Sequence, residues 1–199
     1  YIDWSDIQLR SWDEVAFASR IQNVGEADVL GFEAEIHYQA TDSLQLGVNY
    51  GYADAALAED FLNTQNTPPT VDAAKGTALP GSSKDTFSLL ADWQMSLTST
   101  IDLQASASYV YVSSRPSNFG TVAGLFTGLP DVPSSEVINL SVGIRHDNGV
   151  TVSLFANNLL DDRNVQARSL HGSSSQGRPF ESAPMSRPRT IGLRAGYKF

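Results

Sequence analysis

The sequence predicts an all-β chain that forms a segment of an antiparallel, up-and-down transmembrane β-barrel, with about eight strands. Apolar and polar residues alternate with a period of two along most of the chain. Short turns and long loops alternate strictly between these runs, and aromatic residues gather towards both ends of the runs. A helical membrane protein is excluded, because no run approaches the roughly 18 apolar residues of a membrane helix.

The first clear strand is predicted over residues 30–40, where every second residue is apolar. A helix would place Glu33 and His37 on the same side as Phe32 and Ile36, which an amphipathic helix does not favour. The same alternation returns in six later runs, although Phe155 interrupts one of them. Residues 1–9 are predicted as an eighth strand whose less regular phase indicates a β-bulge. The six later runs cover residues 44–52, 87–95, 101–111, 138–144, 150–156 and 191–199.

The connections predict a barrel with two unlike ends. Short turns at residues 41–43, 98–99 and 147–149 alternate with long segments, and Asn148-Gly149 is a signature of a tight hairpin. All short turns then fall at one end of the sheet, with both chain ends, and all long loops fall at the other. Short periplasmic turns and long extracellular loops are typical of outer-membrane barrels. The long segments are about residues 10–28, 58–83, 115–134 and 161–188.

Periodicity alone leaves open whether the apolar face points into a soluble core or towards lipid. The aromatic residues favour lipid, because they form two groups that could anchor a barrel at both membrane interfaces. Tyr38, Trp93, Tyr197 and Phe199 lie near the short turns, and Tyr50, Tyr52, Phe87, Tyr109 and Tyr111 lie nearer the long loops. On this interpretation five charged residues line a wet lumen: Glu33, Glu35, Asp92, Arg145 and Arg194.

Composition excludes several classes of function. The formal net charge of −9 argues against a nucleic-acid partner, and the absence of cysteine excludes disulfides and thiolate metal sites. Glu33 and Glu35 would lie about 7 Å apart on one strand face. Paired carboxylates can serve glycoside hydrolysis, but we interpret these two as lumen-lining charge. The sequence therefore predicts no catalytic set, no metal site and no cofactor, and we do not expect an enzyme.

The last long loop is the candidate ligand surface. It concentrates cationic donors in an otherwise acidic chain, and such donors could bind an anionic ligand such as a ferric chelate. Contact with lipopolysaccharide phosphates, or simple solvation of the loop, remains an alternative. The candidate ligand-binding residues are Arg163, Arg168, His171, Arg178 and Arg187.

Several segments, in order along the chain, resemble the TonB-dependent outer-membrane receptors. YIDWSDIQ (residues 1–8), NVGEA (23–27) and GFEAE (31–35) resemble a hairpin in the middle of that barrel, and KGTALPGS (75–82) resembles the loop returning to the next strand. LFANNLLD (154–161) resembles the penultimate strand, which usually ends in Asn-Leu-Phe-Asp. RPRTIGLRAGYKF (187–199) resembles the final strand, with an assembly signal carried by Ile191, Leu193, Tyr197 and Phe199.

The resemblance implies a bacterial outer-membrane receptor that takes up a scarce nutrient: a ferric siderophore above all, otherwise cobalamin or a saccharide. Such receptors have a 22-stranded barrel filled by a plug domain. Residues 1–199 are therefore expected to be the C-terminal part of the barrel, without the plug domain and the N-terminal barrel strands. The implied partners are outer-membrane lipid and lipopolysaccharide, the barrel-assembly machinery, a small-molecule nutrient and, through the missing plug, TonB.

Two alternatives remain open from the sequence. One is a freestanding eight-stranded outer-membrane barrel with a structural or adhesive role. The other is a soluble β-barrel that binds an apolar ligand inside.

Overall fold

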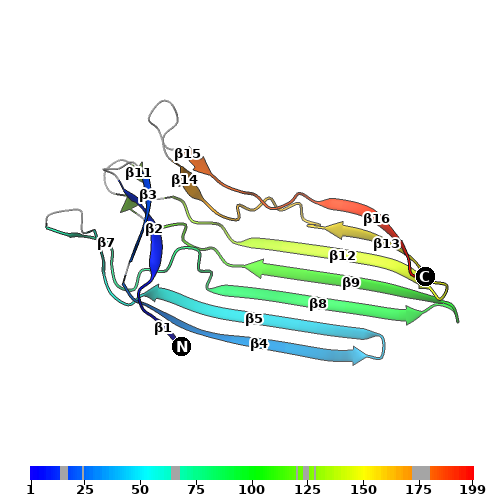
Figure 1. Ribbon diagram of the computed structural model, residues 1–199. Coiled ribbons are helices and arrows are strands. Elements are labelled where there is room, and N and C mark those ends of the chain that lie inside the picture. The colour runs from blue at the N-terminus through cyan, green and yellow to red at the C-terminus, as the bar shows by residue number, and fades with distance from the viewer. Residues whose placement is uncertain are drawn as a thin grey trace.

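The computed structural model describes residues 1–13, 18–23, 25–63, 68–119, 121–122, 126–127, 129–171 and 180–199. Its main element is an eight-stranded antiparallel sheet, in which the strands follow one another in chain order (Figure 1). This order confirms the predicted up-and-down all-β fold. The strands are β1 (Ile2–Trp4), β4 (Ala27–Thr41), β5 (Leu44–Leu57), β8 (Asp85–Ser96), β9 (Ile101–Val112), β12 (Ser135–His146), β13 (Val150–Asn157) and β16 (Thr190–Tyr197).

The first predicted strand is wrong in extent. Only Ile2–Trp4 joins the main sheet, where Ile2 pairs with Val29 and Trp4 pairs with Ala27 at the loop end of β4. Gln8 and Leu9 already belong to another strand. The prediction that the start of the chain lies at the short-turn end is therefore wrong, because the start lies beside the loop end of β4.

Each long connection contains a small two-stranded hairpin that the sequence did not reveal. These hairpins gather at one end of the main sheet, whereas the short turns β4–β5, β8–β9 and β12–β13 lie at the other (Figure 1). The predicted asymmetry between the two ends is therefore confirmed. The hairpins are β2 (Gln8–Asp13) with β3 (Ala18–Asn23), β6 (Phe61–Asn63) with β7 (Thr70–Ala73), β10 (Thr121–Val122) with β11 (Phe126–Thr127), and β14 (Ser169–His171) with β15 (Phe180–Ser182).

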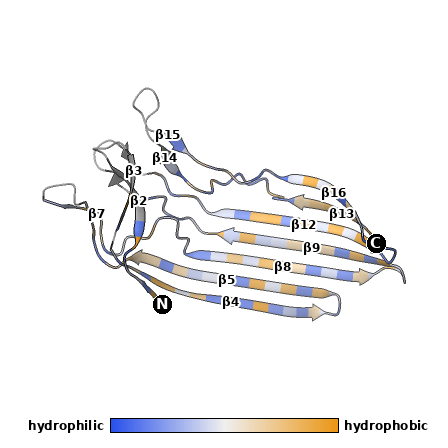
Figure 2. Cartoon of the chain, in the orientation of Figure 1, coloured by the Kyte–Doolittle hydropathy of each residue, from blue (hydrophilic) through white to orange (hydrophobic). Residues whose placement is uncertain are grey.

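The strand register collects the apolar side chains on one face of the sheet, because directly paired residues point to the same side. One row across seven strands is Tyr38, Leu46, Ala91, Ala107, Leu140, Ala156 and Ile191. Hydropathy accordingly alternates along the strands (Figure 2). This face is exposed: Phe32 is 58% and Leu193 is 71% accessible. A soluble sandwich would bury these side chains, so the exposure favours a face turned towards lipid.

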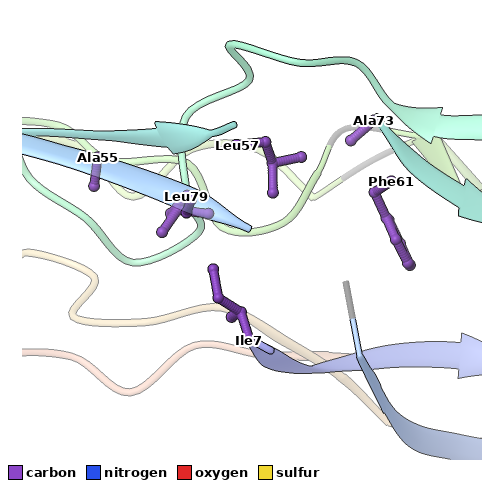
Figure 3. Packing of buried hydrophobic residues seen from close by; sticks show 7 residues of the cluster. Ile7, Ala55, Leu57, Phe61, Ala73 and Leu79 are labelled. Carbon is purple, nitrogen blue, oxygen red and sulfur yellow. The ribbon is translucent and has the colours of Figure 1, made fainter. Parts of the chain in front are cut away.

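The buried core lies at the base of the long loops and not in the middle of the sheet (Figure 3). Ala27 has the same parity along β4 as Glu33 and Glu35, so the core covers the loop end of the polar face. Leu79 is fixed there by its backbone N–H, which donates to the carbonyl of Ala55 at 2.9 Å. The loops are therefore anchored over the polar face. The core residues are Ile7, Ala27, Ala55, Leu57, Phe61, Ala73 and Leu79.

Gly143 marks a close approach between β12 and β13. A Cβ at this position would lie 2.5 Å from the Cβ of Ser153 and 2.6 Å from the carbonyl oxygen of Val152. Because the backbone of β13 cannot yield easily, Gly143→Ala is expected to destabilise the barrel by about 1–3 kcal/mol. Urea unfolding of the protein in liposomes measures this, with Ser141→Ala on the same strand face as the control. Equal midpoints for the two variants would contradict the close approach.

Candidate functional site

The five charged residues predicted for the lumen lie on one face, opposite the apolar face. Asp92 pairs with Gln45 on one side and with Ser106 on the other, and Arg145 pairs with Asp102. Alternate residues of a strand point to the same face of a sheet, and this alternation places Glu33, Glu35 and Arg194 on the polar face as well. That this polar face lines a water-filled lumen stays a prediction.

Charges on the polar face are paired locally. A guanidinium nitrogen of Arg145 lies 2.8 Å from a carboxylate oxygen of Asp102, whose other oxygen accepts a 2.8 Å hydrogen bond from Ser96. Glu35 contacts Nε2 of His37 at 2.7 Å, and both side chains are more than half exposed. Exposed pairs of this kind contribute little to stability. Their main effect is to hold the charged side chains of the polar face in fixed positions.

A hollow of about 590 Å³ opens on the polar face towards the short turns. Its lining includes Gln45, Gln94, Gln104, Ser106 and Ser153, which come from four different strands. Amide and hydroxyl groups can donate and accept hydrogen bonds, and the carboxylates of Asp42 and Asp92 add negative charge to the lining. The hollow is therefore suited to a hydrated polar occupant and not to an apolar one.

Phe155, which interrupts the apolar alternation, also lies on the polar face. The guanidinium carbon of Arg194 stands 5.3 Å from the centre of the Phe155 ring, within the range of a cation–π contact. A Cβ on Gly192, its partner on β16, would meet that ring at 2.6 Å. The aromatic ring thus occupies the space that glycine leaves. The sequence signal for this arrangement is the phenylalanine out of phase beside a glycine-containing strand.

The structure separates the candidate ligand residues. Arg168 forms an ion pair with Glu181 and its Nε donates to the carbonyl of Asp131 at 3.3 Å. Its side chain is only 19% exposed. Through these contacts Arg168 connects the last long loop to the preceding long loop, which contains Asp131. His171 belongs to β14, where it pairs with Phe180, and Arg178 lies outside the described residues.

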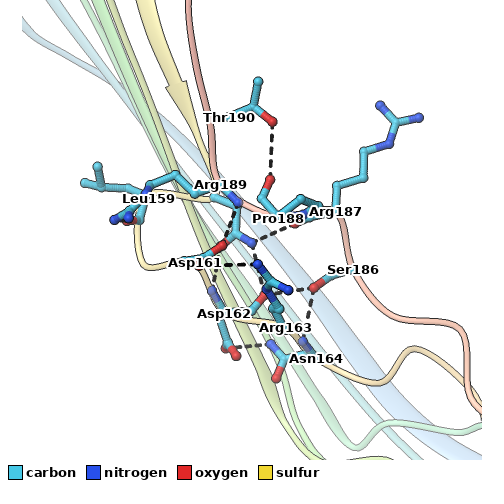
Figure 4. Close-up of polar contacts among 11 residues, drawn as sticks. Leu159, Asp161, Asp162, Arg163, Asn164, Ser186, Arg187, Pro188, Arg189 and Thr190 are labelled. Carbon is cyan, nitrogen blue, oxygen red and sulfur yellow. Dashed lines mark hydrogen bonds and ion pairs between the residues drawn. The ribbon is translucent and has the colours of Figure 1, made fainter.

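The other two candidates lie near each other and are freer. Arg163 is 63% exposed and lies 3.8 Å from a carboxylate oxygen of Asp161, at the limit of an ion pair. Arg187 is exposed, and its side chain points away from the surrounding hydrogen-bonded residues (Figure 4). Within the described part of the chain, the Arg187 side chain has no hydrogen bond or ion pair.

A group of hydrogen bonds around Asn158 attaches the last loop to the sheet (Figure 4). Asn158 is 5% exposed and has a φ of 50°, which asparagine tolerates better than most residues. Its side-chain amide donates to the carbonyls of Asp162 at 3.0 Å and Arg187 at 2.8 Å, and its side-chain oxygen accepts from the N–H of Asp162 at 3.1 Å. One asparagine therefore joins the end of β13 to the segment that leads into β16.

Asp161 adds a second link in the same place. Its carboxylate accepts the backbone N–H of Arg189 at 2.8 Å, and the Arg189 side chain donates to the carbonyl of Leu159 at 3.3 Å. The hydrogen bond from the backbone of Arg189, aided by the charge of Arg163, lowers the pKa of Asp161. The carboxylate is therefore ionised at neutral pH and holds this junction.

Three consecutive loops are tied to one another. The N–H of Gly81 donates to the carbonyl of Pro116 at 2.8 Å, and the rings of Phe61 and Phe119 lie 6.0 Å apart. The Arg115 guanidinium donates to the carbonyl of Gln166. Together with the contacts of Arg168, these links make a connected layer above the sheet.

The described residues contain no cluster of three or more His, Asp or Glu side chains that could hold a metal ion. Within the same part of the chain, no helix has the length and apolar character needed to cross a membrane.

Solved structures of siderophore receptors share this fold. The ferric yersiniabactin uptake receptor FyuA of Yersinia pestis is 16% identical with a TM-score of 0.69, and the match covers 97% of this chain and 25% of that one. The siderophore receptor PiuA of Acinetobacter baumannii is 23% identical with a TM-score of 0.65, covering 90% and 23%. The ferric-catecholate import receptor Fiu of E. coli is 20% identical with a TM-score of 0.55 for its open form, covering 89% and 22%.

This chain thus spans about a quarter of the length of each solved receptor. No curated protein matches it. The model of the family described as "TonB dependent receptor-like, beta-barrel" matches residues 1–159. The chain therefore belongs to the TonB-dependent receptor β-barrel family, which places it in the bacterial outer membrane.

Proposed function

We propose that this chain is the C-terminal part of the barrel of a TonB-dependent receptor that takes up a ferric siderophore. The family match over residues 1–159 carries this proposal. The names of the three similar structures, which concern ferric yersiniabactin, a siderophore and ferric catecholates, support the class of nutrient. In this proposal the plug domain, the contact with TonB and the N-terminal strands belong to the rest of the parent protein.

In the proposed receptor the chain forms part of the barrel wall, part of its outer opening and part of the surface that lines the lumen. The apolar face would contact lipid, the tied loops would surround the outer opening, and the polar face would line the passage. The role is transport and not catalysis. The exposed apolar face does not fit the soluble-barrel alternative, and no described feature favours a freestanding structural or adhesive barrel.

We assign ligand contact to Arg187 and Arg163 among the five candidates. Both are exposed at the outer end of the sheet, and a guanidinium can donate two parallel hydrogen bonds to an anionic oxygen pair. Arg168 is instead a positioning residue, because its donors already bind Glu181 and Asp131. In a chain with a net charge of −9, exposed cations at the mouth would favour an anionic ferric chelate.

Binding by the purified full-length parent receptor tests the proposal. Calorimetric titrations use a ferric catecholate, a ferric hydroxamate, ferric yersiniabactin, cobalamin and a maltooligosaccharide. We expect at least one ferric siderophore to bind and cobalamin and the saccharide not to bind. Binding of cobalamin or the saccharide alone would overturn the class of nutrient. Binding of none, together with normal growth of a deletion strain under iron limitation, would favour the freestanding-barrel alternative.

Arg187→Gln is expected to weaken binding of that ferric siderophore about tenfold, the loss of one charge-assisted hydrogen bond. Lys75→Gln removes an exposed cation from another loop and should leave the affinity unchanged. Arg168→Gln should raise hydrogen exchange in the last loop, because its contacts are structural. An unchanged affinity for Arg187→Gln would remove this residue from the binding surface.

The predicted assembly signal remains part of the proposal. Ile191, Leu193, Tyr197 and Phe199 are all more than half exposed, and the first three have the same parity along β16. Because β16 is an edge strand of the main sheet, an exposed row of this kind is available to the barrel-assembly machinery before the barrel closes.

A further inference from the structure

The last strand of the main sheet has no tight turn to fix its register. β13 and β16 are connected by residues 158–189, whereas a short hairpin fixes the register of its strands through its turn (Figure 1). Leu154 on the apolar face pairs with Leu193. After a shift of β16 by two residues it would face Ile191 or Ala195, which are also apolar. Apolar alternation along the two strands therefore allows three registers.

On the polar face, the ring of Phe155 lies over the backbone of Gly192, its partner in β16. A Cβ on Gly192 would lie 2.6 Å from Cζ of this ring. The guanidinium carbon of Arg194 stands 5.3 Å from the ring centre and covers the ring from the next polar-face position of β16. The ring therefore needs a glycine opposite it and a longer side chain two residues further on.

Two other glycines of the polar face are covered by threonine hydroxyls. A Cβ on Gly51 would lie 2.8 Å from Oγ1 of Thr86, which is its partner in β8. A Cβ on Gly196 would lie 2.9 Å from Oγ1 of Thr151, its partner in β13. A hydroxyl at the end of a short side chain can turn aside, but a rigid six-membered ring has few other positions. Phe155 is therefore the stricter constraint on strand pairing.

A shift of two residues would remove the glycine from beneath the ring. Phe155 would face Thr190 in one direction or Arg194 in the other, and the Cβ of that residue would enter the space that the ring fills. Overpacking of this kind should favour the native pairing by a factor of about ten or more. The polar face therefore separates three registers that the apolar face leaves nearly equal.

Hydrogen bonds beyond the loop end of β16 act on the same strand. The side chain of Asn158 donates to the carbonyl of Arg187 at 2.8 Å, and the carboxylate of Asp161 accepts the N–H of Arg189 at 2.8 Å. These contacts hold the segment that leads into β16, whereas Phe155 contacts β16 itself. Substitutions on the polar face can therefore test the ring without removing these hydrogen bonds.

We propose that the contact between Phe155 and Gly192 sets the register of β16 on β13. In a closed barrel the number of strands and their stagger together determine the diameter. A shift of two residues in one strand pair changes that stagger, so the contact positions the last strand for closure of the barrel. Phe155 is in this role a positioning residue, and the role is independent of the nutrient that the receptor takes up.

Cross-linking of introduced cysteine pairs measures the register directly, because the chain contains no cysteine of its own. Val152→Cys is the fixed member of each pair. Ala195→Cys is its partner in the native register, and Leu193→Cys and Tyr197→Cys are its partners in the two shifted registers. The protein is oxidised in the outer membranes of cells that produce it, and only membrane-inserted protein is compared. Without further substitutions we expect a cross-link only in the native pair.

Phe155→Ala removes the ring, and we expect the ratio of shifted to native cross-links to rise at least about tenfold. Leu154→Ala, at the neighbouring position on the apolar face, is the matched control and should leave the ratio unchanged. Combining Gly192→Arg with Arg194→Gly moves the glycine by two residues. We expect this exchange to move the cross-link to the pair with Tyr197→Cys, in which Phe155 meets the relocated glycine.

A further exchange, Phe155→Gly with Gly192→Phe, places the ring on the other strand and should keep the native cross-link. A variant that does not insert in cells is refolded into liposomes and cross-linked there. Native cross-links alone, both in Phe155→Ala and after relocation of the glycine, would overturn the proposal and assign the register to Asn158 and Asp161. An equal rise in Leu154→Ala would also overturn it, because general loosening of the strand pair would then explain the shift.

Discussion

Replacing Leu193 by arginine is expected to lower the free energy of unfolding by about 2–4 kcal/mol. Leu193 is 71% exposed on the apolar face and pairs with Leu154 in the middle of the β13–β16 ladder. If this face contacts lipid, the guanidinium has no water or carboxylate to bind at that depth. Urea unfolding in liposomes, followed by tryptophan fluorescence, measures the change.

Thr190→Arg is the control for this prediction. Thr190 begins β16 on the opposite face, where it pairs with Asn157, so an arginine there should remain hydrated and cost much less. A larger loss for Thr190→Arg than for Leu193→Arg would reverse our assignment of the two faces.

Asn158→Ala is expected to cost about 2–4 kcal/mol, because it removes three hydrogen bonds from a buried junction. The substitution leaves the carbonyls of Asp162 and Arg187 and the N–H of Asp162 without their side-chain partner. The substitution also places alanine at a φ of 50°, a left-handed conformation that alanine tolerates less well than asparagine because it has no side chain to form a local hydrogen bond. The same unfolding assay, together with hydrogen exchange of β16, should show that the last strand loosens first.

Two further variants separate the causes. Asn158→Gly accepts the positive φ but still loses the hydrogen bonds, so it should be milder than Asn158→Ala yet clearly destabilising. Asn148→Ala, at an exposed short turn where the side-chain oxygen accepts one N–H at 3.1 Å, should cost at most about 1 kcal/mol. If Asn158→Gly were as stable as wild type, the conformational contribution would dominate and the hydrogen bonds would contribute little.

The main sheet could be predicted because a strand with one apolar and one polar face has apolar and polar residues in alternation along its sequence. Every run of alternation corresponds to a strand, and the strands mostly extend past the predicted ends. Three of the four loop hairpins could not be predicted, because their strands are only two to four residues long. Such pairs depend on tertiary contacts, as in the packing of Phe61 on Phe119.

The candidate site was predictable only in part. Strand parity is sufficient to place Asp92 and Arg145 on one face. Sequence cannot distinguish the fastened Arg168 from the freer Arg187, because the partners of Arg168 lie 13 and 37 residues away. The role of Asn158 depends equally on Arg187, 29 residues further along the chain.

The ties between the loops decide what can be exchanged between related receptors. A graft of residues 161–188 alone would leave Arg115 without the carbonyl of Gln166 and Asp131 without the side chain of Arg168. A graft of residues 115–134 alone would break the contact between Gly81 and Pro116 as well. Modular engineering of a new specificity should therefore transplant the three loops as one cassette, together with the small core on which they stand.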